Sequence, residues 1–282
     1  MVNVVLDFDG TLTDADKEAV PYKEIHKQEF CRRTGVPVER VNTISAVLET
    51  TLKLDSLEGW VDNGKVVAPA CADPYVLTST VYRKIIDHLN KGLVKRYNLP
   101  QTEEERSKLL EELFRASYPH AAVVFRKGAR RFLDDLMDEH NVVVVTNSDE
   151  QKVREKIGKL TKGDYEVPVV GDARKYKIDD SFGFVPESVR PDGFQRPVFL
   201  RRRNYFNVLT KLYKERSFGT TNTFVIGDIY ELDLALPEHL GYGVILVNTP
   251  GASEHEKKHL ESSRKGFVAH SFGEVLDILK SG

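Results

Sequence analysis

Cysteine is nearly absent from this chain of 282 residues, which contains only Cys31 and Cys71. Two cysteines are too few for a disulfide framework or a cysteine-ligated metal cluster. We therefore expect a cytoplasmic location. Long apolar runs are missing as well: no segment approaches the roughly eighteen uninterrupted apolar residues that a membrane-spanning helix needs. The chain is expected to be a soluble globular protein with no membrane partner.

The sequence also lacks a strong excess of charge of either sign, with a formal net charge of −2. Such a balance gives no electrostatic footprint for nucleic acid. A local basic run such as Arg201–Arg203 is more typical of a solvated helix face than of a binding patch. We expect no signal peptide, because Asp7 and Asp9 interrupt the N-terminal apolar run and no basic segment precedes it. Nothing in the sequence indicates an oligomeric state.

What the chain does have is the stretch VVLDFDGTLTD, residues 4–14. Its first three residues predict a short strand that is buried on both faces. Side chains two apart share one face of a strand, so Asp7 and Asp9 would point the same way. Two such anions coexist only if one is protonated, a cation lies between them, or the strand has ended and water screens them.

The two residues after this pair favour a binding site. Gly10 lets the backbone approach an anion closely, and the Thr11 hydroxyl with nearby amide groups can bind phosphate oxygens. The alternative is a simple turn at Asp9-Gly10 after an edge strand, with both acids solvated.

The same pattern, an apolar run followed by small polar or acidic residues, recurs along the chain. It is found in NVVVVTNSDE (141–150), TNTFVIGDIYELD (221–233), YGVILVNTPG (242–251) and GFVAHSFGEVLDIL (266–279). With the first strand these make five strand–turn–helix units, which predict an α/β fold with a doubly wound parallel sheet. In such sheets ligands bind at the carboxyl ends of the strands, where these polar residues fall.

A long segment without a buried-strand signal separates the first strand from the helix predicted at 127–139. Four parts of it read as amphipathic helices, namely 23–35, 37–54, 77–97 and 102–117. Between the second and third, Asn63-Gly64 predicts a small hairpin. We therefore expect a core domain made of 1–15 and 119–282, with a helical cap domain inserted at 16–118.

Three of these motifs resemble those of a known superfamily. DFDGT, VVVVTNS and VIGDIYELD look like motifs I, II and IV of the haloacid dehalogenase-like hydrolases. The helical insertion stands where that superfamily's C1 cap is inserted, and RKGARRFLDDL resembles the helix that re-enters the core. The resemblance covers the whole chain, by motif for the core and only by position and helicity for the cap. It implies a Rossmann-like core.

Phosphoryl transfer needs a nucleophile, neutralisation of phosphate charge and a proton for the leaving group. Asp7 is placed to attack phosphorus and form an aspartyl phosphate. Carboxylates and carbonyls at strand ends suit Mg²⁺ rather than zinc. The resemblance implies that Asp7 and Asp228 bind this ion through their side chains and Asp9 through its backbone carbonyl, which leaves the Asp9 side chain free for proton transfer.

The transferred group needs its own ligands. Thr146 and Asn147, with the amides of Gly10 and Thr11, would hold the phosphoryl group, although a helix N-cap is the alternative for the first two. Asp233 fits either a metal ligand, direct or through water, or a cap of its helix's first turn.

The basic residue of motif III is ambiguous in this sequence. The superfamily normally supplies a lysine, often followed by proline, whereas here Arg196 precedes Pro197 in QRPVFLRRR. Arginine neutralises phosphate but binds it in a different geometry. Lys175 and Lys177, in GDARKYKIDD, are competitors that keep the lysine. Arg196 and Lys175 rank close together, and a surface salt bridge is the alternative for either.

The second aspartate distinguishes between reactions. Release of a halide needs no proton, whereas a phosphate ester leaves as an alkoxide, so an acid at Asp9 is useful for ester hydrolysis. We therefore predict a Mg²⁺-dependent phosphatase acting on a small phosphorylated metabolite. A phosphomutase or phosphotransferase on the same core, or an inactive regulatory protein with this fold, is the alternative.

Overall fold

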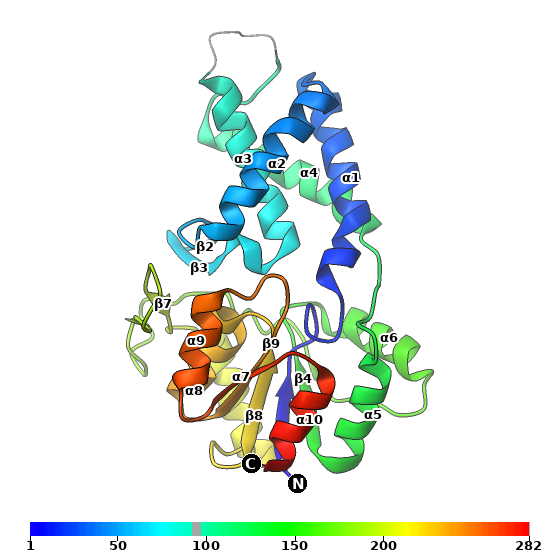
Figure 1. The fold of residues 1–282 in the computed structure, drawn as a ribbon, viewed down its shortest axis with the longest axis vertical. Helices are drawn as coiled ribbons and strands as arrows, with labels where there is room; N and C mark the ends of the chain where they lie inside the picture. The colour runs from blue at the N-terminus through cyan, green and yellow to red at the C-terminus, as the bar shows by residue number, and fades with distance from the viewer. Residues whose placement is uncertain (92–96, 282) are drawn as a thin grey trace. The chain divides into compact units, whose positions relative to one another are not determined.

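The computed structural model of the chain describes residues 1–91 and 97–281 (Figure 1). Its contacts divide the chain into two compact units. The core unit comprises Met1–Asp14, Val61–Ala68 and Phe125 to the C-terminus, and the helical unit comprises Ala15–Trp60 and Pro69–Val124. Segment 61–68 therefore belongs to the core unit, whereas the sequence pattern placed it inside the cap.

A six-stranded parallel sheet forms the centre of the core unit, in the order β10-β9-β8-β1-β4-β5. The strands are β1 (Asn3–Leu6), β4 (Asn141–Val145), β5 (Val169–Val170), β8 (Thr223–Gly227), β9 (Gly243–Val247) and β10 (Gly266–Ala269). In the central strand β1, Val4 lies in register with Val142 of β4 and Phe224 of β8. The polar residues that follow β1, β4 and β8 therefore meet at one edge of the sheet.

Helices cover both faces of the sheet, because successive side chains of each strand enter different hydrophobic clusters. Val4 and Leu6 belong to a cluster with α5 (Ala129–Glu139), α6 (Glu150–Thr161) and α10 (Phe272–Ser281). Val5 belongs to a cluster with α7 (Arg203–Arg216), α8 (Ala235–His239) and α9 (Glu254–Ser262). The prediction of a doubly wound α/β core is confirmed.

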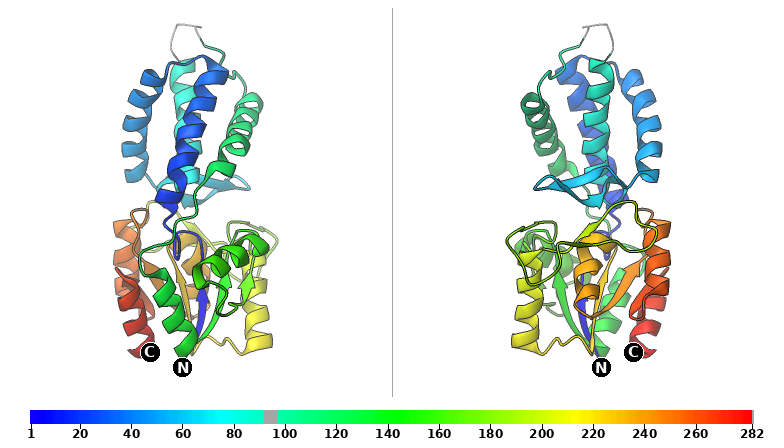
Figure 2. Two further views of the ribbon diagram at one scale, coloured as in Figure 1. Left: turned by 90° about the vertical axis from the view of Figure 1, so that its right-hand side faces the viewer. Right: turned by 90° about the vertical axis from the view of Figure 1, so that its left-hand side faces the viewer.

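Four helices make up most of the described part of the helical unit, and Figure 2 shows them running alongside one another. They are α1 (Ala15–Thr34), α2 (Val38–Leu54), α3 (Pro74–Asn90) and α4 (Glu103–Ser117), with 3₁₀ turns η1 (Ala70–Ala72) and η2 (Tyr118–His120). Their apolar faces share a core that includes Phe30 and Ile85. The four amphipathic patterns are thus confirmed as helices, although residues 92–96 of the third prediction lie outside the described residues.

Two short hairpin sheets complete the fold. β2 (Gly59–Asp62) and β3 (Lys65–Pro69) form the hairpin that the sequence predicts. Asn63 and Gly64 have φ angles of 48° and 71°, which are typical of a two-residue hairpin turn. β6 (Ser188–Val189) and β7 (Val198–Phe199) pair antiparallel. This second pair carries no sequence signal, because two residues are too few to show alternation.

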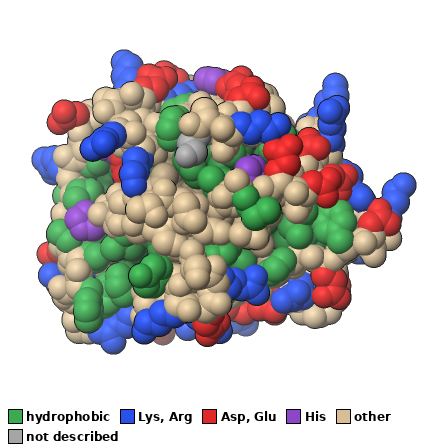
Figure 3. All heavy atoms as spheres, turned by 90° about the horizontal axis from the view of Figure 1, so that it is seen from below, with side chains coloured by type: hydrophobic (Ala, Val, Ile, Leu, Met, Phe, Trp, Pro, Cys, Tyr) green, Lys and Arg blue, Asp and Glu red, His purple; other side chains and the backbone are tan. Residues whose placement is uncertain are grey.

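None of the helices in the described ranges combines the length and apolar character that crossing a bilayer requires. Figure 3 views the molecule from the lower end of Figure 1, and on this face acidic and basic side chains lie interspersed. Hydrophobic side chains lie between them. This mixed distribution matches the small net charge of the sequence.

His26 on α1 is fully buried, and within the described residues neither ring nitrogen has a hydrogen-bond partner. The rings of Tyr22 and Tyr82 lie against it, with centroid distances of 5.3 and 4.6 Å. Burial lowers the pKa of His26 to about 4, because the imidazolium would lose its hydration. The folded helical unit therefore keeps this histidine neutral.

We predict that acid destabilises the helical unit through His26. Between about pH 6.5 and about pH 4 the unfolded chain binds a proton that the folded chain excludes, so stability falls as the pH falls. At about pH 5 the loss is about 2 kcal/mol, at about 1.36 kcal/mol per pKa unit. Urea unfolding followed by the fluorescence of Trp60, the single tryptophan, measures it.

His26→Phe is expected to remove this loss, whereas replacing the exposed His88 of α3 by Gln leaves it in place. The same pH dependence in wild type and His26→Phe would contradict the assignment.

Candidate active site

The carboxyl end of β1 supplies the first acidic residue of the site. The strand ends at Leu6, and the amide of Asp7 donates to the Ile226 carbonyl of β8 at 2.8 Å. The Asp7 side chain is buried. Its Oδ1 accepts from Lys175 Nζ at 2.6 Å and its Oδ2 from the Thr11 hydroxyl at 3.1 Å. Burial raises the pKa of Asp7 to about 7, against the opposing effect of the Lys175 charge.

Two further aspartates follow β8. Asp228 comes directly after the strand, and a single π-helical turn, η3 (Tyr230–Leu234), carries Asp233. Carboxylate oxygens of Asp7, Asp228 and Asp233 lie within 4.8 Å of one another. Burial, and then the charges of Asp7 and Asp233, raise the pKa of Asp228 well above its ordinary value. Three buried carboxylates therefore repel one another in one small site.

Asp233 makes contacts that bear on both roles that the sequence left open. Its Oδ2 accepts from the Ile229 amide at 3.1 Å, as a cap of η3. Its Oδ1 accepts from Lys175 Nζ at 2.8 Å and belongs to the carboxylate cluster. Gly227 permits this approach, because a Cβ there would lie 2.5 Å from the Cβ of Asp233.

Lys175 supplies the positive charge that faces these acids. It is almost fully buried, and its ammonium contacts both Asp7 and Asp233. Burial by itself lowers the pKa of an ammonium, but the charges of Asp233 and Asp7 outweigh that effect and hold the Lys175 pKa above its ordinary value. This lysine stays protonated at neutral pH.

The structure brings neither Arg196 nor Lys177 to the acidic cluster. Arg196 is buried elsewhere, and its guanidinium donates two hydrogen bonds to the Glu231 carboxylate at 2.8 and 2.7 Å. Lys177 Nζ pairs with Asp62 of the β2–β3 hairpin at 2.8 Å. Of the three basic candidates, it is Lys175 whose ammonium is placed against Asp7. The structure thus favours Lys175 in a choice that the sequence left open.

Asp9 belongs to a different hydrogen-bonded group from Asp7, because β1 ends before either residue and the two side chains do not share a strand face. Asp9 Oδ2 accepts from the Thr146 hydroxyl at 3.1 Å and from the Ser148 hydroxyl at 2.7 Å. Lys156 Nζ of α6 lies 3.7 Å from its Oδ1. The Asp9 side chain is 38% exposed, so it has access to solvent that Asp7 lacks.

Thr146 and Asn147, which follow β4, do not cap the helix that comes after them. The N-cap of α6 is Asp149, whose side chain accepts from the Lys152 amide at 2.9 Å. Asn147 Oδ1 accepts from the Lys175 amide at 2.7 Å. The two residues therefore connect the end of β4 with Asp9 and with Lys175.

Gly10 is the point where the backbone comes closest to the acidic cluster. Its φ is +83°, and a Cβ there would lie 2.1 Å from Asp228 Oδ2. The Gly10 amide donates to the Thr13 hydroxyl at 3.1 Å, and the Thr11 hydroxyl lies 3.3 Å from Asp228 Oδ1. The turn after β1 thus lies directly against Asp228.

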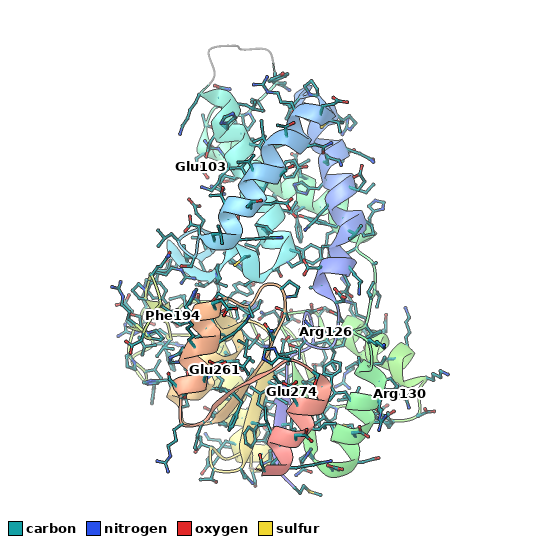
Figure 4. The ribbon with its side chains drawn as sticks, viewed as in Figure 1. Glu103, Arg126, Arg130, Phe194, Glu261 and Glu274 are labelled. Atoms are coloured by element: carbon teal, nitrogen blue, oxygen red, sulfur yellow. The ribbon has the colours of Figure 1, made fainter. Side chains whose placement is uncertain are left out.

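Sequence reasoning missed Ser148, Arg126 and Arg202. Arg126, labelled in Figure 4, donates from Nε to the Thr13 carbonyl at 3.3 Å, and its charge lowers the pKa of Asp228 against the effect of burial. Arg202 corrects the expectation of a solvated run at Arg201–Arg203, because it is fully buried and donates to the Lys175 carbonyl. Three consecutive arginines carry no signal that singles out the middle one.

The donor set fits a hard divalent cation. Asp7, Asp228 and Asp233 offer carboxylate oxygens within 4.8 Å of one another, and Mg²⁺ prefers oxygen ligands of this kind. The Asp228 carboxylate occupies the space that a side chain at position 10 would need. These residues would hold such an ion.

Comparison with solved structures gives several matches of the whole chain. The putative hydrolase YfnB from Bacillus subtilis, solved with magnesium bound, is 13% identical, with 99% of this chain and 98% of that chain covered and a TM-score of 0.57. A predicted phosphoglycolate phosphatase from Haemophilus somnus 129PT is 14% identical, with 99% and 97% covered and a TM-score of 0.53. A 2-haloacid dehalogenase from Pseudomonas syringae pv. Tomato DC3000 is 15% identical, with 100% and 99% covered and a TM-score of 0.47.

No family model matches the sequence, and no curated protein matches it either. At identities this low, the structural matches speak for the fold.

We predict that Gly10→Ala weakens divalent-cation binding. The added Cβ collides with the Asp228 carboxylate and forces it out of the cluster, so the affinity for Mn²⁺ is expected to fall at least about tenfold. Gly241→Ala is the matched control, because Gly241 has a similar φ of +89° with no atom within 4 Å of the added Cβ. Titration calorimetry with Mn²⁺ measures both variants, and an unchanged affinity in Gly10→Ala would contradict the ligand assignment.

Proposed function

Since the chain has the fold of the haloacid dehalogenase-like hydrolases, we propose that it is a Mg²⁺-dependent phosphatase. Its substrate is a small phosphomonoester, a phosphorylated metabolite, and the reaction proceeds through an aspartyl phosphate on Asp7. One observation carries the proposal: the Asp7 carboxylate contacts the Lys175 ammonium and lies within 4.8 Å of two further aspartates, while Asp9 has solvent access.

Asp7 is the nucleophile of this reaction. Its carboxylate lies at the carboxyl end of the central strand, where ligands of such sheets bind. A neighbouring cation favours the ionised carboxylate against the effect of burial, and Lys175 at 2.6 Å supplies one positive charge. One oxygen attacks phosphorus, the bond to the ester oxygen breaks, and the phosphoryl group is transferred to Asp7.

Asp7, Asp228 and Asp233 would hold the divalent ion together with the backbone carbonyl of Asp9, and the ion would neutralise phosphate charge there. Lys175 adds positive charge through its ammonium, which contacts Asp7 and Asp233. Thr146 and Asn147 lie beside Asp9 and the Lys175 backbone, where their polar groups can orient the phosphoryl oxygens. Positioning and charge neutralisation are the main requirements of phosphoryl transfer.

Asp9 is the general acid and base. In the first step it gives its proton to the departing alkoxide, and in the second it takes a proton from the water that attacks the aspartyl phosphate. The hydroxyls of Thr146 and Ser148 fix its Oδ2.

We predict that Asp7→Asn and Asp9→Asn have different defects. Asp7→Asn removes the attacking oxygen's charge, so no phosphoenzyme forms. Asp9→Asn keeps the nucleophile, and an aryl phosphate needs little protonation of its leaving group, so attack partly survives. Hydrolysis of the aspartyl phosphate then slows by about 10²- to 10⁴-fold, and the phosphoenzyme accumulates.

Intact-mass spectrometry after brief mixing with p-nitrophenyl phosphate detects the added phosphoryl group. It is expected on Asp9→Asn and not on Asp7→Asn. Equal labelling of both variants, or a phosphoryl group mapped outside the peptide that contains Asp7, would show that the roles are assigned wrongly. Transfer of the group to a sugar phosphate rather than to water would indicate a phosphomutase, and no turnover of any phosphate ester would indicate a regulatory protein.

We also predict that turnover requires Mg²⁺ and that Ca²⁺ replaces it poorly. The smaller ion imposes near-octahedral geometry, whereas the larger one accepts more ligands at longer distances. Release of p-nitrophenol is measured with each ion and with excess chelator. Undiminished hydrolysis in chelator would refute the metal requirement.

A further inference from the structure

Arg202 is fully buried, and its guanidinium binds three backbone carbonyls. Nε donates to Phe199 at 2.9 Å, Nη1 to Lys175 at 2.5 Å and Nη2 to Val67 at 3.0 Å. Burial lowers the pKa of Arg202 to about 10, so the group stays charged at neutral pH. A guanidinium directs its donors in a rigid planar fork. The three carbonyls are therefore held in one arrangement.

One of these carbonyls belongs to the residue that faces Asp7. Lys175 lies in a loop where Asp172 and Arg174 both have positive φ angles, of 48° and 46°. Such conformations are uncommon outside glycine and persist where the surroundings fix them. The Lys175 amide is bound by Asn147 Oδ1, and its carbonyl by Arg202. The backbone of Lys175 is thus fixed on both sides.

The start of α7 contacts Lys175 at its other end as well. Tyr205 follows Arg202 by three positions, so both side chains lie on one face of the helix start. The Tyr205 hydroxyl donates to the Asp233 carbonyl at 2.9 Å, and Lys175 Nζ lies 5.6 Å from the centre of its ring. The start of α7 therefore contacts both the backbone of Lys175, through Arg202, and its ammonium, through Tyr205.

The third carbonyl comes from the β2–β3 hairpin, whose residues 61–68 belong to the core unit. Asp62 binds the same loop, because its Oδ1 pairs with Lys177 Nζ and its Oδ2 accepts from the Ile178 amide, both at 2.8 Å. The hairpin and the loop are therefore joined at Arg202 and at Asp62.

We propose that Arg202 is a positioning residue for Lys175, which fixes the backbone from which the ammonium reaches Asp7 and Asp233. The catalytic consequence rests on the proposed function, whereas the order of the loop does not. Without the guanidinium, the Lys175 carbonyl loses its donor and the positive-φ loop loses a restraint. The ammonium then stabilises the developing charge of phosphoryl transfer less well, so the loss falls on kcat rather than on KM.

Hydrogen exchange tests the order of the loop without any substrate. In Arg202→Met, the amides of residues 172–177 are expected to exchange at least about tenfold faster, while those of β4 keep their rates. The control is Arg196→Met combined with Glu231→Gln, which removes a buried arginine that binds the same hairpin through the Val66 carbonyl and pairs with Glu231. An equal rise of these exchange rates in both variants would show that contacts with the hairpin order the loop, and would overturn the role of Arg202.

Kinetics test the link to Lys175 by a double-mutant cycle. Arg202→Met is expected to lower kcat for p-nitrophenyl phosphate about 10- to 100-fold with KM changed less than about threefold, and Arg202→Lys to recover part of the loss. In a Lys175→Met background the same substitution is expected to change kcat less than about threefold. An equal loss in both backgrounds would show a general structural role and overturn the proposal. Arg216→Met, an exposed arginine at the far end of α7, controls for loss of charge.

The two measurements separate the two proposals. If wild type hydrolyses no phosphate ester, the proposed function fails while hydrogen exchange still decides the role of Arg202. If wild type is active and Arg202→Met alters neither exchange nor kcat, the positioning role alone is refuted. Should Arg202→Met not fold, Arg202→Lys carries both measurements with the same expected directions and the same contradicting outcomes.

Discussion

The contact of the Lys175 ammonium with the carboxylates of Asp7 and Asp233 is the interaction on which the site depends. Three buried carboxylates cannot all stay ionised within a few ångströms of one another unless positive charge lies among them. Lys175 provides one such charge from inside the protein. The directions of the pKa shifts follow from this excess of negative charge. Burial and mutual repulsion raise the pKa values of Asp7 and Asp228, while the same anions raise the pKa of Lys175.

The backbone around the site is arranged to permit this crowding. Gly10 lets the turn after β1 lie against the Asp228 carboxylate, and Gly227 lets η3 fold back until Asp233 reaches Lys175. Parallel strands bring the residues after β1 and after β8 to one sheet edge, but this alone does not place the three carboxylates within 4.8 Å of one another. The two glycines and the π-helical turn provide that last approach, at positions where any Cβ would collide.

The sequence was sufficient for the parts of the fold and site that have a local pattern. Apolar runs that end in small polar or acidic residues located β1, β4 and β8 and thereby Asp7 and Asp228. The local sequence could not decide between Arg196 and Lys175, because the answer depends on which side chain the folded chain buries beside Asp7. The burial of Arg202 escaped prediction for the same reason: two of its three partners are backbone carbonyls of residues distant in the sequence, and a carbonyl is not visible in the sequence pattern.

The charge balance of the cluster explains why a divalent cation and protons are alternatives there. Three carboxylates against one ammonium leave a double negative charge in a buried site, which a divalent cation neutralises and which protons on the acids neutralise otherwise. Metal binding to carboxylates therefore displaces protons, and the raised pKa of Asp7, to about 7, sets this competition near neutral pH. Asp9 lies outside this cluster, because Thr146 and Ser148 hold its side chain in a separate, partly exposed group. The two aspartates of one short motif thus differ in chemistry because their surroundings differ: the Asp7 carboxylate is buried among charged groups, whereas the Asp9 carboxylate is bound by hydroxyls and reaches solvent.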